Sequence, residues 1–201
     1  MKNLIKQILR EYAEEQEKIM TFPSLKIFNN DWNALQQFLK SKGNPKWKIL
    51  SNLDLRGTPI ESLGKLESVG GNLNLTFCPI ESLGNLQSVK GYLNLNNTPI
   101  KSLGNLQSVG GSLNLYNTPI KSLGNLTSVG GHLNLNHTPI ESLGNLTSVE
   151  GNLNLSISSI KSLGNLTSVG GNLYFYNTPI SKKYTEKEIS EMVNVEGNIY
   201  I

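Results

Sequence analysis

The side chains that could carry covalent or metal chemistry are few and badly spaced for it. The two histidines, His132 and His137, are separated by up to about 16 Å of extended chain, too far to share one metal ion. The single cysteine, Cys78, occupies a position where neighbouring copies of a sequence repeat have Thr or Ser. This favours a structural thiol, and one cysteine excludes an intramolecular disulfide. We therefore expect no enzymatic activity, no cofactor and no bound metal.

Aromatic and histidine side chains on an outward-facing surface are better candidates for function. In the run Leu93-Asn94-Leu95, the two-residue alternation places both leucines on one face of a strand and the asparagine on the other. Tyrosine and histidine at outward positions offer a protein partner a large contact area. The alternative is that they are ordinary surface residues without a partner. The predicted partner-binding residues are Tyr92, Tyr116, His132, His137, Tyr174 and Tyr176.

Asparagine fills the central outward position in five successive copies, from Asn74 to Asn154 at intervals of twenty residues. Amide side chains stacked at strand spacing can form a hydrogen-bonded ladder. We therefore expect these asparagines to belong to the scaffold and not to a binding site.

These positions recur because one unit of twenty residues, running from Gly91 to Gly110, is repeated along most of the chain. An incomplete copy begins near Asn52, and altered copies begin at Gly171 and Gly197. Each copy has six apolar side chains and one recognisable strand, so it cannot bury its apolar surface alone. We therefore expect a repeat solenoid with eight parallel strand positions. Full copies begin at Gly71, Gly91, Gly111, Gly131 and Gly151.

The second half of each repeat predicts how the chain returns to the next strand. Pro99 ends the strand, and the apolar residues from Ile100 to Val109 are spaced by three, which suits a 3₁₀ or polyproline-like path. Gly104 argues against a stable α-helix in this segment. The sequence predicts a parallel β-sheet on one face and an irregular or 3₁₀ return path.

The run L-x-L-x-x-T-x-I and the twenty-residue period resemble the shortest class of the leucine-rich repeat family, over residues 52–201. The family has Asn or Cys where this chain has Thr98, and a hydroxyl there can bond a neighbouring backbone group. Where the family has its leading leucine, this chain has Gly70 and its equivalents. We expect the preceding Val69 and its equivalents to point into the core instead. That departure leaves a parallel β-helix as the alternative fold.

The two ends of the repeat array predict helical caps, which an open solenoid needs. Near the N-terminus, Asn30 or Asp31 can start a helix that places Trp32 in the core. Near the C-terminus, Thr185 and Glu188 form a T-x-x-E capping box. Ile189, Met192 and Val193 supply the buried side of that short helix, and residues 197–201 form a final strand with an unpaired edge. The predicted regions are an amphipathic helix at 1–20, a helical cap at 21–51, the solenoid at 52–180, and a cap helix with a final strand at 181–201.

The amphipathic N-terminal helix has several possible roles: packing on the solenoid, pairing with another copy, docking to a partner or lying on a membrane surface. The overall pattern of the sequence, including the N-terminal helix and the closing segment, also resembles uncharacterised leucine-rich proteins of tailed bacteriophages. In some phage head proteins, a short helical targeting segment is cut after a hydrophobic-x-Glu site. Leu9-Arg10-Glu11 has that form.

Charge argues against a nucleic-acid partner, and hydropathy argues against membrane insertion and secretion. Residues 52–180 carry six Lys/Arg against six Asp/Glu, so the solenoid lacks the basic stripe that nucleic-acid binding needs. The sequence has no transmembrane stretch and no apolar core of a signal peptide, so we expect a cytoplasmic protein, with the virion as the alternative.

Together these patterns predict a non-enzymatic module, plausibly phage-encoded, that binds a protein through the outward face of its strands. A virion-associated or glycan-binding structural component is the alternative, because Asn and Tyr also suit sugar contacts. Homo-oligomers through the N-terminal helix or the C-terminal edge strand are a further expectation.

Overall fold

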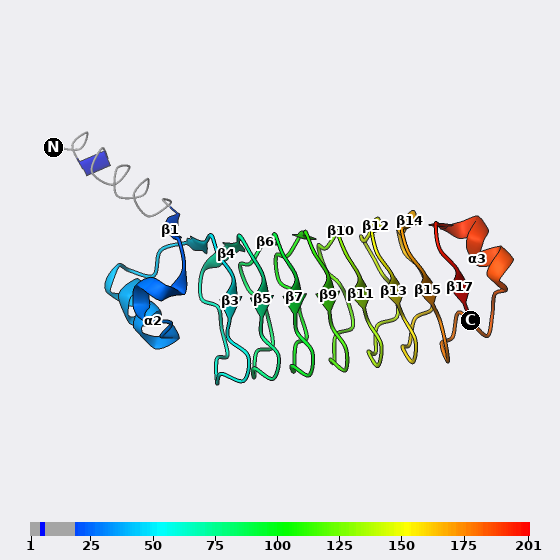
Figure 1. Cartoon of the computed structure of the whole chain (residues 1–201), viewed down its shortest axis with the longest axis horizontal. Helices are drawn as coiled ribbons and strands as arrows, with labels where there is room; N and C mark the ends of the chain where they lie inside the picture. The colour runs from blue at the N-terminus through cyan, green and yellow to red at the C-terminus, as the bar shows by residue number, and fades with distance from the viewer. Residues whose placement is uncertain (1–4, 7–18) are drawn as a thin grey trace.

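The computed structural model describes residues 5–6 and 19–201 and has the form of an elongated parallel β-solenoid (Figure 1). Each coil contributes one strand to an eight-stranded sheet and one to a nine-stranded sheet, and all neighbouring strands are parallel. We number the coils 1 to 8 after the strands of the eight-stranded sheet. These are β3 Leu53–Asp54, β5 Leu73–Asn74, β7 Leu93–Asn94, β9 Leu113–Asn114, β11 Leu133–Asn134, β13 Leu153–Asn154, β15 Leu173–Tyr174 and β17 Ile199–Tyr200.

The nine-stranded sheet begins before the repeats and lies at the top of the solenoid in Figure 1. Within the repeats its strands are two to four residues long, and each pairs in register with its equivalent one coil away. Its strands are β1 Met20–Phe22, β2 Trp47–Ile49, β4 Leu66–Val69, β6 Ser88–Val89, β8 Ser108–Val109, β10 Ser128–Val129, β12 Ser148–Val149, β14 Ser168–Val169 and β16 Asn194–Val195.

The repeat solenoid and its eight strand positions are confirmed, but the expected single sheet is wrong. The segment after Gly104 forms a second strand, Ser108–Val109, because the stacked coils pair there as well. The return path between the two strands is irregular, one of the predicted alternatives, and is not a 3₁₀ helix. The one 3₁₀ helix among the described residues is η1, Leu25–Phe28. The bend in the return path comes instead from Gly104 at φ +58°, whose N–H donates to the Ser102 hydroxyl.

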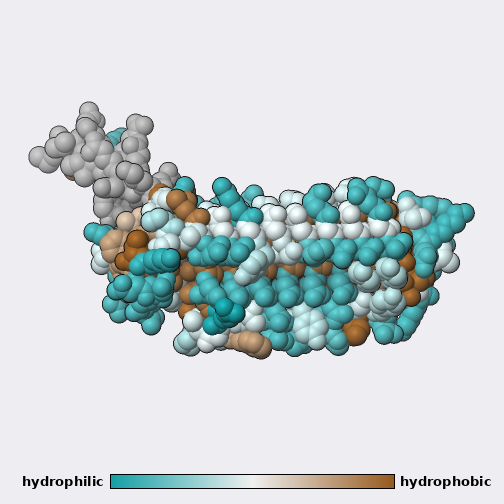
Figure 2. Space-filling model, viewed as in Figure 1, coloured by the Kyte–Doolittle hydropathy of each residue, from teal (hydrophilic) through white to brown (hydrophobic). Residues whose placement is uncertain are grey.

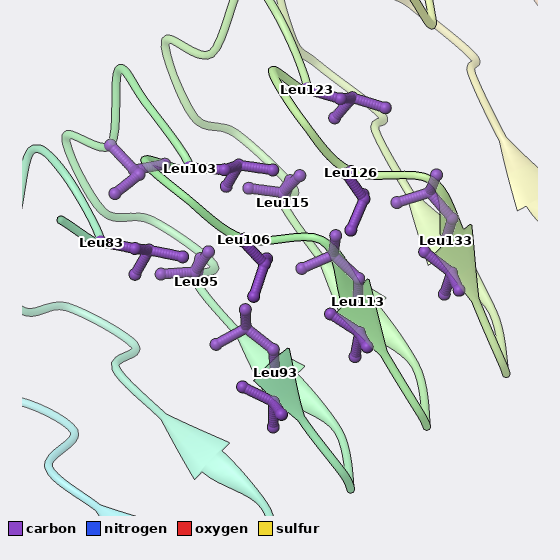
Figure 3. Packing of buried hydrophobic residues seen from close by; sticks show 14 of the residues in the cluster. Leu83, Leu93, Leu95, Leu103, Leu106, Leu113, Leu115, Leu123, Leu126 and Leu133 are labelled. Atoms are coloured by element: carbon purple, nitrogen blue, oxygen red, sulfur yellow. The ribbon is translucent and has the colours of Figure 1, made fainter. Parts of the chain in front are cut away.

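The core is a set of leucine, isoleucine and valine columns that run along the solenoid. Figure 3 shows Leu93, Leu113 and Leu133 at equivalent places on successive coils, all turned to the interior, and each is at most 1% exposed. Burying one such side chain contributes about 1.5–3 kcal/mol. Because every column continues in the next coil, the repeats stabilise one another and position the outward residues at strand spacing.

Helices lie at both ends of the solenoid (Figure 1). Helix α2, Trp32–Ser41, begins after Asp31, whose carboxylate accepts from the N–H groups of Asn33 and Ala34, and both tryptophans are buried, as predicted. Helix α3, Glu186–Met192, begins with the predicted capping box and buries Ile189. The prediction that Met192 is buried is wrong, because Met192 is 49% exposed.

The predicted N-terminal amphipathic helix and its possible cleavage site lie outside the described residues, apart from Ile5 and Lys6, which are helical and exposed. In the remainder of the described chain, 19–201, no helix is long and apolar enough to cross a membrane.

Candidate protein-binding surface

The outward side of the eight-stranded sheet, which we call the strand face, carries rows of side chains at intervals of twenty residues. In the first row, each side chain with an acceptor atom accepts a hydrogen bond from the backbone N–H of the equivalent residue in the next coil. Asn152 Oδ1 accepts from Asn172 N at 2.8 Å, and Ser112 Oγ accepts from His132 N at 3.0 Å. This row therefore fastens one coil to the next. Its members are Asn52, Asn72, Tyr92, Ser112, His132, Asn152, Asn172 and Asn198.

His132 and Tyr92 both belong to this row but differ in what they do there. The Nδ1 atom of His132 accepts a 2.8 Å hydrogen bond from Asn152 N, so the histidine has the same structural role as the asparagines. Tyr92 has no acceptor atom within reach of the next coil. Among the described hydrogen bonds, the N–H of Ser112 has no side-chain acceptor in the coil of Tyr92. A tyrosine here gives up a scaffold hydrogen bond and exposes an aromatic ring.

The second row holds the five asparagines for which a ladder was predicted, and that prediction is wrong. Each side-chain Oδ1 accepts from the backbone N–H two residues later in its own coil, as Asn114 does from Tyr116 N at 3.0 Å. The other asparagines of the row make the same bond, and among the described residues none bonds its neighbour in the row. They fix the start of the turn instead.

Tyrosine replaces asparagine at the end of the second row. Tyr174 and Tyr200 stack with ring centroids 4.9 Å apart and planes 5° apart. Tyr176 lies beside both, at 6.4 Å from Tyr174 and 6.3 Å from Tyr200. We call these three residues the tyrosine cluster. Aromatic pairs at such distances stabilise one another, so the rings form one preorganised surface.

A third group lies at the turn after each strand, where one residue per coil has φ between +54° and +66°. Gly57, Asn97, Asn117 and Asn177 suit this left-handed conformation. His137 also tolerates it, whereas Phe77 and Ile157 do not, and for a bulky or β-branched residue it is a genuine outlier. Phe77 is 65% exposed and Ile157 45% exposed, so burial does not explain them. Strained, exposed apolar residues of this kind are typical of functional surfaces.

The structure divides the six predicted partner-binding residues into separate groups. Tyr116 contacts His137 edge-on at 5.6 Å, in the middle of the solenoid. Tyr174 and Tyr176 belong to the tyrosine cluster at the C-terminal end. Tyr92 is exposed but lies in the first row, two coils before His132.

The sequence also places Phe77, Ile157 and Tyr200 at outward positions, but the predicted partner-binding residues do not include them. A signal for the first two is present in the sequence, because both stand where other copies have Asn or Gly. That signal requires knowing that the position is left-handed. For Tyr200, the signal is its place in the same row as Tyr174.

Two ion pairs on the surface join neighbouring coils. Lys101 pairs with Glu81 at 2.8 Å and Lys161 with Glu141 at 2.9 Å, each across one coil and in solvent, as expected for weak ion pairs. Cys78 is buried and its thiol donates to the carbonyl of Leu55. In residues 5–6 and 19–201, no group of three His, Cys, Asp or Glu side chains is arranged to hold a metal ion.

Comparison with known proteins found nothing similar: no family model, no curated protein and no solved structure matches the chain.

Proposed function

We propose that this protein is a protein-interaction module that binds its partner through the strand face. The residues that carry this function are Tyr92, Tyr116, Tyr174 and Tyr176. They are joined by Tyr200, which completes the tyrosine cluster. The solenoid contributes a rigid surface on which aromatic rings are held in place before binding, so little conformational entropy is lost.

The observation that carries the proposal is the loss of scaffold hydrogen bonds where tyrosines appear. Tyr92 replaces an acceptor that would fasten the next coil, and Tyr174 replaces an asparagine that would fix the turn. A residue kept for the scaffold alone would be Asn, Ser or His at these places. Exposed tyrosines are the residue type that protein interfaces favour.

Affinity capture from bacterial lysate tests the proposal, followed by measurement of the affinity for the captured protein. The test variant carries Tyr92→Asn, Tyr116→Asn and Tyr176→Asn, which restore residue types that other coils use. We expect this variant to remain folded and to bind the captured protein at least about tenfold more weakly.

A matched control carries Gln87→Ala and Gln107→Ala, two exposed residues before strands of the other sheet. It should bind as the wild type does. Equal binding by the tyrosine variant and the wild type would overturn the proposal, as would the absence of any captured protein.

We further propose that the chain belongs to the shortest leucine-rich repeat class, with α2 and α3 as its caps. Support comes from the period of twenty and from the hydroxyls of Thr98 and Thr118, each of which donates to the carbonyl three residues earlier. The capping role is supported by the burial of Trp32, whose ring lies 5.9 Å from that of Trp47 in β2, and of Ile189 in α3, a helix that contacts β16 and β17. Removal of residues 181–201 should then expose coil 7 and cause aggregation, which light scattering would detect; a soluble, monomeric fragment would contradict the capping role.

A further inference from the structure

The turns that follow the strands of the eight-stranded sheet form one long edge of the solenoid, which we call the turn edge. It is the lower edge in Figure 1, and Figure 2 shows brown, apolar groups among teal ones along it. Three rows follow this edge: the left-handed residues, then the prolines, then a row of charged residues. The prolines are exposed or half-buried and rigid: Pro59, Pro79, Pro99, Pro119, Pro139 and Pro179.

The rows along the turn edge are close to mirror-ordered about coil 4. In the left-handed row, Phe77 lies two coils before coil 4 and Ile157 lies two coils after it. The residues just before the left-handed ones form a neighbouring row, and Tyr116 is its member in coil 4. At the ends of the edge, Arg56 in coil 1 corresponds to Tyr176 in coil 7. Phe77 and Ile157 are thus apolar counterparts at the same distance from coil 4, whereas His137 in coil 5 corresponds to the polar Asn97 in coil 3.

The charged row consists of Glu61, Glu81, Lys101, Lys121, Glu141 and Lys161, with the uncharged Ser181 in coil 7. Lys121 lies in coil 4 itself, and the two positions on either side of it carry opposite signs. Glu81 in coil 2 corresponds to Lys161 in coil 6, and Lys101 in coil 3 corresponds to Glu141 in coil 5. All four side chains are about 60% exposed, and they already form the two ion pairs within the chain.

We propose that the turn edge is a docking surface for a second copy of this chain, in an antiparallel arrangement with two-fold symmetry. A two-fold axis beside coil 4 reverses the solenoid, so that coil 2 meets coil 6 of the second copy and coil 3 meets coil 5. In a two-fold interface every contact occurs twice. Phe77 then lies against Ile157 of the second copy, and Tyr116 meets its own equivalent.

The same rotation brings opposite charges together. The two-fold axis runs across the edge, so it reverses the order of the coils but leaves the order of the rows across the edge unchanged. The charged row of one copy therefore meets the charged row of the other. Glu81 faces Lys161 of the second copy, and Lys101 faces Glu141. The two ion pairs of one chain and the two of the other thus form two four-charge groups with alternating signs.

Shifting the second copy by one coil destroys this match. A shift in one direction places Glu81 against Glu141 of the second copy, and a shift in the other places Lys101 against Lys161. Either shift also separates Phe77 from Ile157. In the register centred on coil 4, four opposite-charge contacts outnumber the single like-charge contact, in which Lys121 meets its own equivalent. Each shifted register has at least as many like-charge contacts as opposite-charge contacts, so the centred register is the one that both rows support.

The size of the contact predicts a weak dimer. From coil 1 to coil 7 there are six strand spacings, or about 29 Å, and the contact is one turn wide. It therefore buries less than the ~1,200 Å² of a stable interface, and the dimer should form only at high protein concentration.

Charge exchange tests the proposal with two variants of the full chain. The first carries Glu81→Lys and Lys101→Glu, and the second carries Glu141→Lys and Lys161→Glu. Each keeps an ion pair within the chain, with its direction reversed. In a dimer of either variant alone, like charges face each other at the four exchanged positions. In a dimer with one copy of each variant, all four of these contacts are attractive, and the contact between the two Lys121 side chains is the same in every dimer.

Sedimentation equilibrium up to about 1 mM protein gives the result. We expect the wild type to dimerise, each variant alone to dimerise at least about tenfold more weakly, and an equimolar mixture to regain the association of the wild type. Circular dichroism of each variant confirms that the fold is kept.

A wild-type chain that remains monomeric would overturn the proposal, and so would self-association unaffected in both variants. The latter result would direct attention to the open edge at β17. Tyr116 and Tyr176 belong to both proposed surfaces, but the test uses no other protein and changes none of the proposed tyrosines. Failure of the dimer can therefore be distinguished from failure of partner binding by the strand face.

Discussion

The Nδ1 atom of His132 accepts a hydrogen bond of 2.8 Å from the backbone N–H of Asn152, one coil further along the solenoid. His132, which the sequence predicts as a binding residue, therefore has the same structural role as the asparagines of its row. Its neighbours in the row show that the requirement is an acceptor atom and not a particular side chain.

The first prediction concerns this hydrogen bond. His132→Asn keeps an acceptor and should leave the free energy of unfolding within about 0.5 kcal/mol of the wild type. His132→Phe removes it and should lower that free energy by about 1–3 kcal/mol, because the N–H of Asn152 loses its partner. Urea unfolding measures both, and equal stability of the two variants would show that the bond contributes nothing.

The second prediction concerns strain at the turn edge. Phe77→Asn should raise the free energy of unfolding by about 1 kcal/mol, because asparagine adopts the left-handed conformation more readily. Little burial is lost, since Phe77 is mostly exposed. The reverse change, Asn97→Phe, should destabilise by a similar amount. Urea midpoints with unchanged slopes would measure both effects; a loss of stability in Phe77→Asn would mean that the ring packs against its own chain.

The third prediction concerns pH and the start of helix α3. The backbone N–H of Thr185, and then its hydroxyl, donate to the Glu188 carboxylate and hold the pKa of Glu188 below its usual value of 4.5. A lowered folded-state pKa means that Glu188 stabilises the helix above the unfolded-state pKa and loses that effect as the pH falls through the folded-state value.

We therefore expect the amide protons of α3 to exchange faster relative to those of the core when the pH falls from about 6 to about 3. Glu188→Gln, which cannot titrate, is the control and should show little of this relative change. A titration of the Glu188 carboxyl followed by NMR should give a midpoint below 4.5; a midpoint at or above it would contradict the prediction.

Comparison of particular residues shows what the sequence could and could not predict. The period of twenty fixes the strands, and inward leucines such as Leu93 follow from simple alternation. The second strand at Ser108–Val109 is too short to show alternation, and it exists because neighbouring coils pair there. The difference between Tyr92 and His132 depends on an N–H in the next coil, which a linear pattern does not contain. Strain at Phe77 likewise needs the backbone conformation.

The last prediction concerns the close approach of successive coils at Gly111. The N–H of Gly111 donates to the carbonyl of Gly91 at 2.9 Å, and a Cβ atom at Gly111 would lie 2.8 Å from the Gly91 carbonyl carbon. Gly111→Ala should therefore lower the free energy of unfolding by about 1–3 kcal/mol, because backbone atoms of the neighbouring coil must move.

Gly57 is the matched control. It has a left-handed conformation with no atom within 4 Å of an added Cβ, and Asn97 fills the equivalent position two coils later. Gly57→Asn should leave stability nearly unchanged, so that a large effect confined to Gly111→Ala assigns the cost to the contact between coils. If both changes cost the same, loss of glycine and not the spacing of the coils would be the cause. The repeat would then owe its glycines to backbone conformation alone.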